Sequence, residues 1–430
     1  MLKPMPEILP TPLWMQDAAA PALGDQAIPA QVDVLVVGAG YTGLSAARET
    51  AAAGRSTLVL DSAPLGGGCS SRNGGQVAYS IKPSFQTLKS RHGAETALGI
   101  CREGMQAVAD LRSMAREEGV DCDWRDTGCF YGAHTPRHFD AMVRESGEQA
   151  AELGQKVSVV PRAQQRSEIA SDFYFGGLVY HEDASVNPMR LLLSLLRRAR
   201  ERGAVVIDRC PVSAMRSAGR GFEVLTPLGM VQARQVLLAT NGYSGPLSPW
   251  HRRRVIPIGS YQIATEPLGC ERVRALIPNG RNIYDSRRVV VYFRPSPDGE
   301  RIIFGGRAAL SERDPLTCVR RLQAMMARIF PQLKSAAISH AWAGWVAYTF
   351  DKLPHLGKHN GVYYCMGYCG QGVPLATYYG KRIGQQMLGL AEGRTALNGL
   401  KFASRPYYFG VPWFLAPSVL AFRLMDAAGW

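Results

Sequence analysis

The sequence predicts an α/β protein in which a parallel-sheet, nucleotide-binding domain is interleaved with an α+β domain built on an antiparallel sheet. Three stretches carry this prediction. Residues 33–61 have the pattern of a strand, a glycine turn, a helix and a second strand, and residues 362–390 repeat the order strand, glycine turn, helix. Between them, residues 259–305 alternate as strands do around a Pro-Asp-Gly turn, which is typical of an antiparallel sheet.

The first stretch places the pattern G-x-G-x-x-G in the context that this motif needs. Val34 to Val37 form a short apolar, β-branched run, as expected for a buried parallel strand. Gly38 permits a sharp turn, Gly40 lets the backbone approach a pyrophosphate, and Gly43 lets the following helix pack closely on the sheet. The start of that helix offers free N–H groups and the positive end of its dipole to phosphates.

The acid that follows the second strand narrows the choice of ligand. Thr57 to Leu60 form this strand, and Asp61 lies about 20 residues beyond the glycines, where a ribose diol is held. An acid there favours an unphosphorylated ribose, so NAD or FAD rather than NADP, and the motif alone leaves these two open. Two more glycine-rich segments, beginning at residues 66 and 367, are expected to close over the ligand, which favours a permanently held FAD.

The remaining elements follow in chain order. Amphipathic helices are predicted over 84–118 and 137–154, and a helix that begins at Asn187-Pro188 ends at Gly203. A buried strand is predicted over 235–239. We therefore predict an N-terminal arm over 1–31, a nucleotide-binding domain from 32–80, 185–245 and 336–430, and a substrate domain from 81–184 and 246–335.

Composition narrows the class of protein further. The formal net charge of +14 is compatible with acidic substrates, nucleic acid or an anionic membrane surface, but the arginines are spread along the chain, so a solvated basic surface is preferred and nucleic acid is not expected as a partner. The nine cysteines include no C-x-x-C pair, which predicts free thiols in a reducing cytoplasm and no metal site. No apolar run approaches the length of a membrane span. The apolar stretch 411–425 is interrupted by Pro412, Pro417 and Arg423; peripheral membrane contact through it stays open, and packing on the body of the protein is preferred.

Six short motifs together resemble a known family. They are GAGYTG at 38–43, SRNGGQ at 71–76, ATNGY at 239–243, GGR at 305–307, D-x-L-P-H-L-G at 351–357 and GYCGQGV at 367–373. This set resembles the D-amino-acid-oxidase-type FAD-dependent oxidoreductase superfamily, and within it the γ-glutamylputrescine oxidase-like bacterial amine oxidases. The resemblance implies a Rossmann-like FAD-binding domain of the glutathione-reductase type beside the substrate domain.

The resemblance also implies positions that contact FAD. In order along the chain they are Gly38, Gly40, Tyr41, Thr42, Gly43, Asp61, Ser62, Ser71, Arg72, Asn73, Gly74, Gly75, Gln76, Val212, Thr240, Asn241, Gly344, Asp351, Gly370, Gln371, Gly372 and Val373. The first glycines would cradle the pyrophosphate, the SRNGGQ loop would lie against the isoalloxazine, and the last four residues would approach its N1–C2=O edge. Many relatives have His where this chain has Gln371. Cys69 and Cys369 lie in loops expected near the flavin and are predicted to be unattached.

The implied activity is oxidation of a C–N bond in a small amine or amino acid. A hydride passes to flavin N5, and the resulting imine is hydrolysed to a carbonyl. The candidate catalytic residues are Tyr261, Arg294, Trp345 and Gln371, with Tyr292, Tyr348 and Tyr368 as further pocket residues. Arg294 is a candidate partner for a substrate carboxylate, and Lys352 is a candidate for the lysine that oxygen-using relatives place over the flavin.

Three alternatives remain open from the sequence. One is a dehydrogenase that passes electrons to a membrane quinone or a partner subunit instead of O2. Another is a flavoprotein acting on nucleic acid, suggested only by the basic charge. The last is a non-catalytic flavin-binding subunit. The identity of the amine and the oligomeric state do not follow from the sequence.

Overall fold

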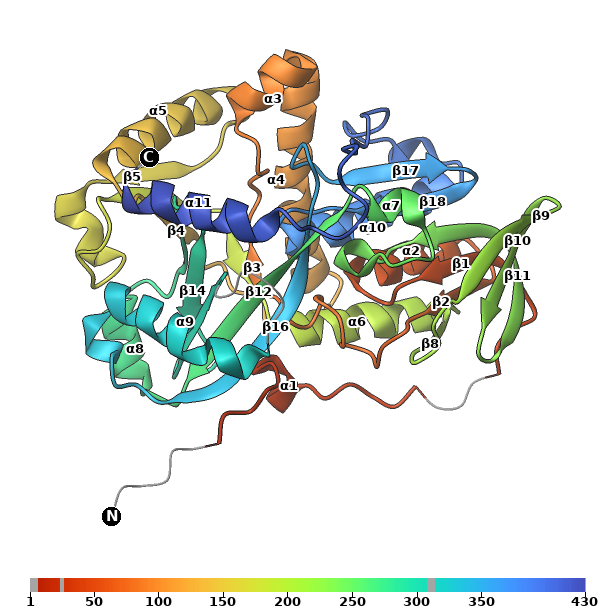
Figure 1. Cartoon of the computed structure of the whole chain (residues 1–430), viewed down its shortest axis with the longest axis horizontal. Coiled ribbons are helices and arrows are strands. Elements are labelled where there is room, and N and C mark those ends of the chain that lie inside the picture. The colour runs from red at the N-terminus through yellow and green to blue at the C-terminus, as the bar shows by residue number, and fades with distance from the viewer. Residues whose placement is uncertain (1–6, 24–26, 308–313, 430) are drawn as a thin grey trace.

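A computed structural model of the chain describes residues 7–23, 27–307 and 314–429. Its strands form two large sheets that lie side by side, with a short ribbon of β3 (Gln76–Val77) and β7 (Ala184–Ser185) in addition (Figure 1). None of the helices in the described part is long and apolar enough to cross a membrane.

The first sheet is built around parallel strands. Its order is β17 (His355–His359), β18 (Val362–Met366), β11 (Gly229–Leu238), β1 (Gln31–Val37), β2 (Thr57–Leu60) and β8 (Val205–Ile207). β1 pairs in parallel with β11 and β2, and β18 joins β11 in the same direction. An antiparallel ribbon of β9 (Ala214–Ala218) and β10 (Gly221–Thr226) extends from β11. The carboxyl ends of β1, β2, β11 and β18 therefore meet at one edge, where α/β sheets bind their ligands.

Helices pack closely on this sheet because small residues line their contacts. α2 (Tyr41–Ala52) lies against α10 (Gly372–Met387) and α6 (Pro188–Glu201). A Cβ atom added to Gly380 would lie 2.6 Å from the carbonyl oxygen of Thr42, and one added to Gly384 would lie 2.9 Å from that of Ala46. Only glycine allows α10 to approach the backbone of α2 this closely. α3 (Phe85–His92) and α4 (Ala94–Arg116) complete this side of the molecule.

The second sheet has eight strands. Its order is β16 (Ile338–Tyr348), β12 (Ile256–Thr265), β15 (Ile302–Gly306), β14 (Val291–Pro295), β13 (Asn282–Asp285), β4 (Cys129–Gly132), β6 (Gly177–Tyr180) and β5 (Val157–Val160). All neighbouring pairs are antiparallel except β13 with β4. One face buries Ile263, Phe293 and Phe304 in a core that includes residues of α9 (Pro315–Ile329). A parallel-sheet domain joined to a mainly antiparallel one confirms the predicted fold class.

Peripheral elements complete the chain. They are α1 (Trp14–Asp17), α5 (Pro136–Leu153), α7 (Pro249–Arg252), α8 (Cys270–Leu276), α11 (Leu415–Ala427) and the 3-10 turns at Arg162–Ser167, Asn241–Tyr243, Pro331–Leu333 and Ala391–Gly393. The described part of the N-terminal arm is attached to the body, since the N–H of Leu9 donates to the carbonyl of Ser339 and the buried Trp14 donates to the carbonyl of Asn73.

One strand pairs with a sheet other than the one predicted for its part of the chain. β16 falls in the range 336–430 predicted for the nucleotide-binding domain, but it pairs with β12 along its whole length and so belongs to the second sheet. Its far end returns toward the first sheet, where the carbonyl of Ala347 accepts from the N–H of Cys369 at 2.9 Å. Residues 338–348 therefore connect the two sheets. The other predicted domain limits stay predictions.

Candidate functional site

Two helix starts meet at the carboxyl edge of the first sheet. α2 begins after Gly40 and α10 begins after Gln371, and neither of these two residues caps its helix through a side chain. The hydroxyl of Ser70 accepts from the first N–H group of α2, that of Tyr41, at 3.1 Å. The hydroxyls of Thr42 and Tyr368 share a hydrogen bond of 2.6 Å, which fixes one start against the other. The positive dipole ends of two helices in one place favour a ligand that carries negative charge.

The glycine turn before α2 leaves room for such a ligand. Gly38 has φ +111°, a conformation that favours glycine, and a Cβ on it would lie 2.9 Å from the carbonyl oxygen of Ala239. A Cβ on Gly43 would overlap the carbonyl oxygen of Gly38. A Cβ on Gly40 would lie 2.9 Å from the hydroxyl of Ser70, so this glycine opens the turn toward the next loop.

Asp61 is fastened to the same turn. Its carboxylate accepts from the N–H of Ala39 at 2.8 Å and from that of Ala63 at 3.0 Å, which leaves lone pairs on both oxygens for further donors. Burial raises the pKa of Asp61 above its usual range. The carbonyl of Asp61 accepts from the N–H of Cys210, which brings the segment with Val212 to this edge. Ser62 beside it is exposed.

A third strand end joins the edge through Asn241. Its amide oxygen accepts from the N–H of Gly367 at 2.9 Å and so links the end of β11 to the end of β18. Thr240 shares a 2.7 Å hydrogen bond with Ser244, which holds this turn in shape. The three segments predicted to meet the nucleotide are thus in contact with one another.

The SRNGGQ loop is braced by its own polar groups. Ser71 donates to the carbonyl of Gly66, Arg72 to that of Gly67 at 3.0 Å, and the Asn73 amide to that of Ser70 at 3.0 Å. The carbonyl of Arg72 accepts from Gln262 of β12 at 2.6 Å and from Trp342 of β16 at 3.1 Å. The loop therefore connects the glycine turn of the first sheet to the second sheet.

We call the face of the second sheet that meets this loop the site face. It carries Ser260, Gln262, Tyr292, Gly305 and Gly344. A Cβ on Gly305 would overlap the ring of Tyr292, and one on Gly74 would lie 3.1 Å from the same ring, so two glycines let the ring lie between sheet and loop. The Tyr292 hydroxyl shares a 2.9 Å hydrogen bond with Ser260, and burial raises the pKa of Tyr292 to about 12.

Comparison with known proteins decides what this edge holds. The family described as FAD dependent oxidoreductase, DAO, matches residues 33–386. The chain belongs to this family. It is 31% identical over 379 residues to the gamma-glutamylputrescine oxidoreductase of Escherichia coli K12, covering 87% of each chain, and 30% identical over 378 residues to the probable oxidoreductase OrdL of Haemophilus influenzae, covering 86% of each.

Solved structures share the fold. The glycine oxidase of Geobacillus kaustophilus superposes with a TM-score of 0.74 at 19% identity, covering 88% of this chain and 100% of that one. The L-proline dehydrogenase of P. horikoshii gives 0.70 at 17% identity, covering 91% and 99%. The cofactor of this family is FAD, and the cradle left by Gly38, Gly40 and Gly43 fits its pyrophosphate.

Strand register places two of the predicted catalytic residues away from the site face. Side chains alternate along a strand, so Tyr261 points away from the site face that its neighbours Ser260 and Gln262 share. Tyr261 is instead buried in the core beneath α9. Trp345 pairs with Gly259, two residues before Tyr261 on β12, so it shares the face of Tyr261. The Cβ of Trp345 lies 3.2 Å from the Cβ position of Gly242. Neither residue is brought to the site face.

Arg294 is a structural residue rather than an open anchor for a carboxylate. It is only 4% exposed, and it donates to the carbonyls of Val186 at 2.9 Å and Gly75 at 3.3 Å. Its guanidinium also lies over the ring of Trp14. Burial lowers its pKa to about 9. These contacts pin the loop after Asn73 to the second sheet, so we leave Arg294 out of the proposed site.

The second glycine turn gathers polar groups that the sequence did not single out. Gln371 donates to the hydroxyl of Ser80 at 2.8 Å. Gly370 has φ +96°, and its Cβ position lies 3.8 Å from Cε of Lys82 and 3.9 Å from the hydroxyl of Tyr348. Lys82 comes from the loop before α3, and no local pattern marks it. Lys352, the predicted lysine, lies in an exposed turn at φ +66°.

Arg307 lies close to Tyr348. It follows β15 two residues after Gly305, so alternation places it on the site face. Its charge interacts with Tyr348, and burial lowers its pKa. No ion pair joins its guanidinium to a residue within the described ranges. The GGR motif contained this residue, but its approach to Tyr348 follows only from the folded chain.

Asp351, Gly344 and the two cysteines predicted near the flavin contact residues of the six motifs. Asp351 binds His355 at 2.9 Å, and although burial acts to raise its pKa, the contacts with His355 keep that pKa below its usual value. Gly344 faces Arg72 and Cys69. Burial raises the pKa of the Cys69 and Cys369 thiols to about 11, and none of the nine cysteines, all of which lie in the described ranges, forms a disulfide.

The other predicted contacts lie at their motifs. Tyr41 donates to the carbonyl of Pro188 at 2.9 Å, and the Gln76 amide donates to that of Phe293 at 3.3 Å. Gly372 and Val373 form the first turn of α10.

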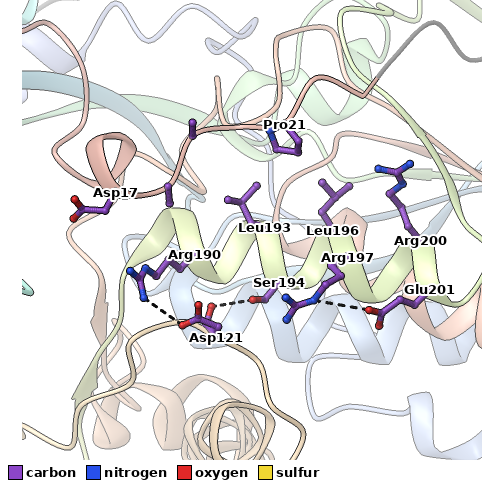
Figure 2. Close-up of a pocket in the computed structure, with 12 residues that line it drawn as sticks. Asp17, Pro21, Asp121, Arg190, Leu193, Ser194, Leu196, Arg197, Arg200 and Glu201 are labelled. Carbon is purple, nitrogen blue, oxygen red and sulfur yellow. Dashed lines mark hydrogen bonds and ion pairs between the residues drawn. The ribbon is translucent and has the colours of Figure 1, made fainter.

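A separate cavity lies outside this site. It has a volume of about 640 Å3 and lies between the residues after α1 and the outer face of α6. Figure 2 shows Arg190, Arg197, Arg200 and Leu193 along one wall and Pro21 opposite. Asp121 and Glu201 pair with Arg190 and Arg197, so these charges are already balanced. None of the lining residues belongs to the glycine turns.

Proposed function

We propose that the protein oxidises the C–N bond of a small amine that carries a carboxylate elsewhere in the molecule, in the manner of γ-glutamylputrescine. The observation that supports this most directly is a half-buried arginine without an acidic partner in the described chain, Arg307, which interacts with Tyr348. The hydroxyl of Tyr348 lies 3.9 Å from the Cβ position of Gly370 in the second glycine turn. The E. coli relative named for γ-glutamylputrescine matches over most of both chains, which favours this class of substrate.

The chain would divide the work among three groups of residues. FAD supplies the two-electron acceptor when bound. Gly40, the start of α2 and Asp61 would hold its adenosine end by N–H donation and by acceptance from the ribose. Gln371, fixed by Ser80, would place the start of α10 toward its reactive end. Tyr292 would cover this end and exclude water.

The nearby cations would act on the substrate. Arg307 would pair with the carboxylate in a charge-assisted hydrogen bond. A positive charge near an amine lowers the pKa of that amine, and Lys82 beside Gly370 is placed to do so. The substrate nitrogen would then keep the neutral lone pair that C–H cleavage requires. No protein acid or base is needed for this step, so positioning would supply most of the rate.

A dehydrogenase that reduces a membrane acceptor is the second candidate. The exposed apolar side chains of residues 407–425 favour it, because they offer a surface for contact with a membrane. Only the formal charge suggests action on nucleic acid, and no feature of the site face adds to it.

The test is an anaerobic screen of the purified holoprotein. γ-Glutamylputrescine, putrescine, glycine and proline are mixed with it, and the loss of the visible flavin absorption is followed. Rapid bleaching by γ-glutamylputrescine and slow bleaching by putrescine, which has no carboxylate, is the expected result. Bleaching by putrescine at an equal rate would contradict the carboxylate requirement. Peroxide formation in air, compared with reduction of a soluble quinone, separates oxidase from dehydrogenase.

A further inference from the structure

The C-terminal segment concentrates exposed apolar side chains. Of the sixteen large apolar side chains found exposed in the described ranges, eight lie between residues 407 and 425. Trp413 is 64% exposed and Leu424 is 65% exposed. α11 buries only Val419, although its sequence is mainly apolar. Single exposed apolar residues are ordinary on a protein surface, but such a concentration marks an interaction site.

This segment is fixed to the body and is not a loose tail. Tyr408 is fully buried, and its hydroxyl donates to the carbonyl of Val255 at 2.7 Å. The Asp426 carboxylate accepts from the N–H groups of Arg288 at 2.8 Å and Val289 at 3.0 Å. In Figure 1, α11 lies across the view in front of strands of the second sheet. The apolar side chains are therefore held outward by a scaffold, and they have not simply failed to pack.

Positive charge surrounds these side chains. Lys401, Arg405 and Arg253 are exposed. The Arg253 guanidinium lies 4.6 Å from the ring centre of Phe409, and that of Arg405 lies 5.1 Å from the ring centre of Phe350. These arginines thus contact aromatic rings. Asp426 is the sole acid in residues 395–430, and backbone N–H groups already occupy its carboxylate.

We propose that this C-terminal face, formed by Tyr407, Phe409, Trp413, Leu420 and Leu424 with Lys401, Arg405 and Arg253, binds the surface of an anionic lipid bilayer. Tryptophan and tyrosine settle at the level of lipid headgroups, where leucine reaches the acyl boundary and arginine pairs with phosphate. This is contact with one leaflet, since no helix in the described part could span a bilayer.

A second copy of the chain fits this face less well. A two-fold dimer would place the same patch on both partners. Lys401, Arg405 and Arg253 of both copies would then lie in one interface, with no free acid in the segment to offset their charge. A bilayer rich in anionic headgroups supplies the opposite charge together with an apolar layer.

The position of the face bears on the chemistry of the site. Arg423 of α11 donates to the carbonyl of Arg307 at 3.2 Å, so the membrane-facing helix touches the end of the site face. A bilayer on this face would therefore lie next to the end of β15 that carries Arg307. The inference about membrane binding stands without the proposed substrate, because it concerns a surface that the catalytic step does not use.

The test is flotation of the full-length holoprotein with vesicles. It should float with vesicles that contain anionic phosphatidylglycerol and remain behind with pure phosphatidylcholine. The double variant Trp413→Ser, Leu424→Ser should reduce flotation by about tenfold or more, while its flavin content and its rate with a soluble amine stay unchanged. The matched control is Leu228→Ser, Met230→Ser, which removes apolar side chains of similar exposure from the turn between β10 and β11.

A second pair of variants separates charge from apolar contact. Lys401→Glu, Arg405→Glu should abolish the preference for anionic vesicles. Lack of flotation by the wild-type protein, or equal loss in the control, would overturn the proposal. Light scattering measures whether the protein is a monomer or a dimer in solution, which decides between a bilayer and a second copy. A dimer that the Trp413→Ser, Leu424→Ser variant dissociates, without any vesicle binding by the wild type, would assign the face to a second copy.

Discussion

The hydroxyls of Thr42 and Tyr368 lie 2.6 Å apart although 326 residues separate them in the chain. Thr42 is in the first turn of α2, and Tyr368 is in the glycine turn before α10. Both side chains are buried, and Tyr368 also contacts the thiol of Cys365. This hydrogen bond therefore sets the distance between the two helix starts that would face the two ends of FAD.

Tyr368→Phe tests this connection. Removal of the hydroxyl leaves the buried Thr42 oxygen without its partner, which should lower the free energy of unfolding by about 1–2 kcal/mol. Flavin content should fall with it, since the two helix starts lose their fixed spacing. Thermal unfolding and the ratio of flavin to protein absorbance measure both effects. Tyr363→Phe on β18, where the ring lies under Lys358, is the control and should change neither.

Gly40→Val tests the pyrophosphate cradle. The new side chain meets only the hydroxyl of Ser70, which can rotate, so the protein should still fold. It would occupy the space of the pyrophosphate, so the purified variant should carry little FAD and should not be reconstituted by adding it. Gly147→Ala within α5 has open space around it and should keep full flavin content with equal or higher stability. Normal flavin in Gly40→Val would reject the assignment.

Gln371→Ala tests the start of α10. Loss of the contact with Ser80 should leave FAD bound, because the adenosine end is untouched, but should slow anaerobic flavin reduction by about tenfold. Stopped-flow absorbance measures the rate. Gln106→Ala, on the exposed side of α4, should behave as wild type. An unchanged rate in Gln371→Ala would remove this residue from the site.

Arg307→Met tests the proposed carboxylate partner. The apparent affinity for a carboxylate-bearing amine should weaken by about tenfold to a hundredfold, while that for putrescine changes little. The split between KM and kcat is informative because a positioning role predicts a larger effect on KM. Arg320→Met, an exposed arginine on α9, is the control. Equal effects on both amines would show that Arg307 supports the fold instead.

Because His251 is buried, we expect the free energy of unfolding to fall in acid. His251 lies beside Tyr364, its Nδ1 shares a 2.6 Å hydrogen bond with Ser248, and burial lowers its pKa to about 3. The unfolded chain binds a proton near the ordinary value of about 6.5. The contribution of this group is complete above that value and is lost as the pH falls toward about 3.

The slope attributable to His251 is at most about 1.4 kcal/mol per pH unit. Chemical unfolding at several pH values should show a flatter acid limb for His251→Gln than for the wild type. His181→Gln, at an exposed position, should keep the wild-type profile. Parallel curves for wild type and His251→Gln would assign the acid sensitivity to other groups.

Local sequence patterns were sufficient to predict the nucleotide-binding unit at residues 33–61. The β-branched run before Gly38, the spacing of the glycines and the acid at Asp61 each answer a requirement of the local backbone, so residues close in sequence carry the whole signal. The same holds for the turn at Gly370 and for the helix that begins at Asn187, whose side chain caps it. The resemblance of the six motifs to a known family then identified the cofactor as FAD.

Pairing between distant strands decided which side chains reach the site. A shift of one residue in the pairing of two strands moves every side chain to the other face of the sheet. The local sequence of β12 or β16 does not indicate which of its faces meets the cofactor. For this reason Tyr261 and Trp345 were predicted in the pocket, whereas Ser260 and Gln262 are the residues of β12 that lie on the site face. Arg294 is buried by contacts with backbone more than a hundred residues away. Lys82 approaches the second glycine turn, and Arg307 approaches Tyr348, only because segments distant in the sequence meet there.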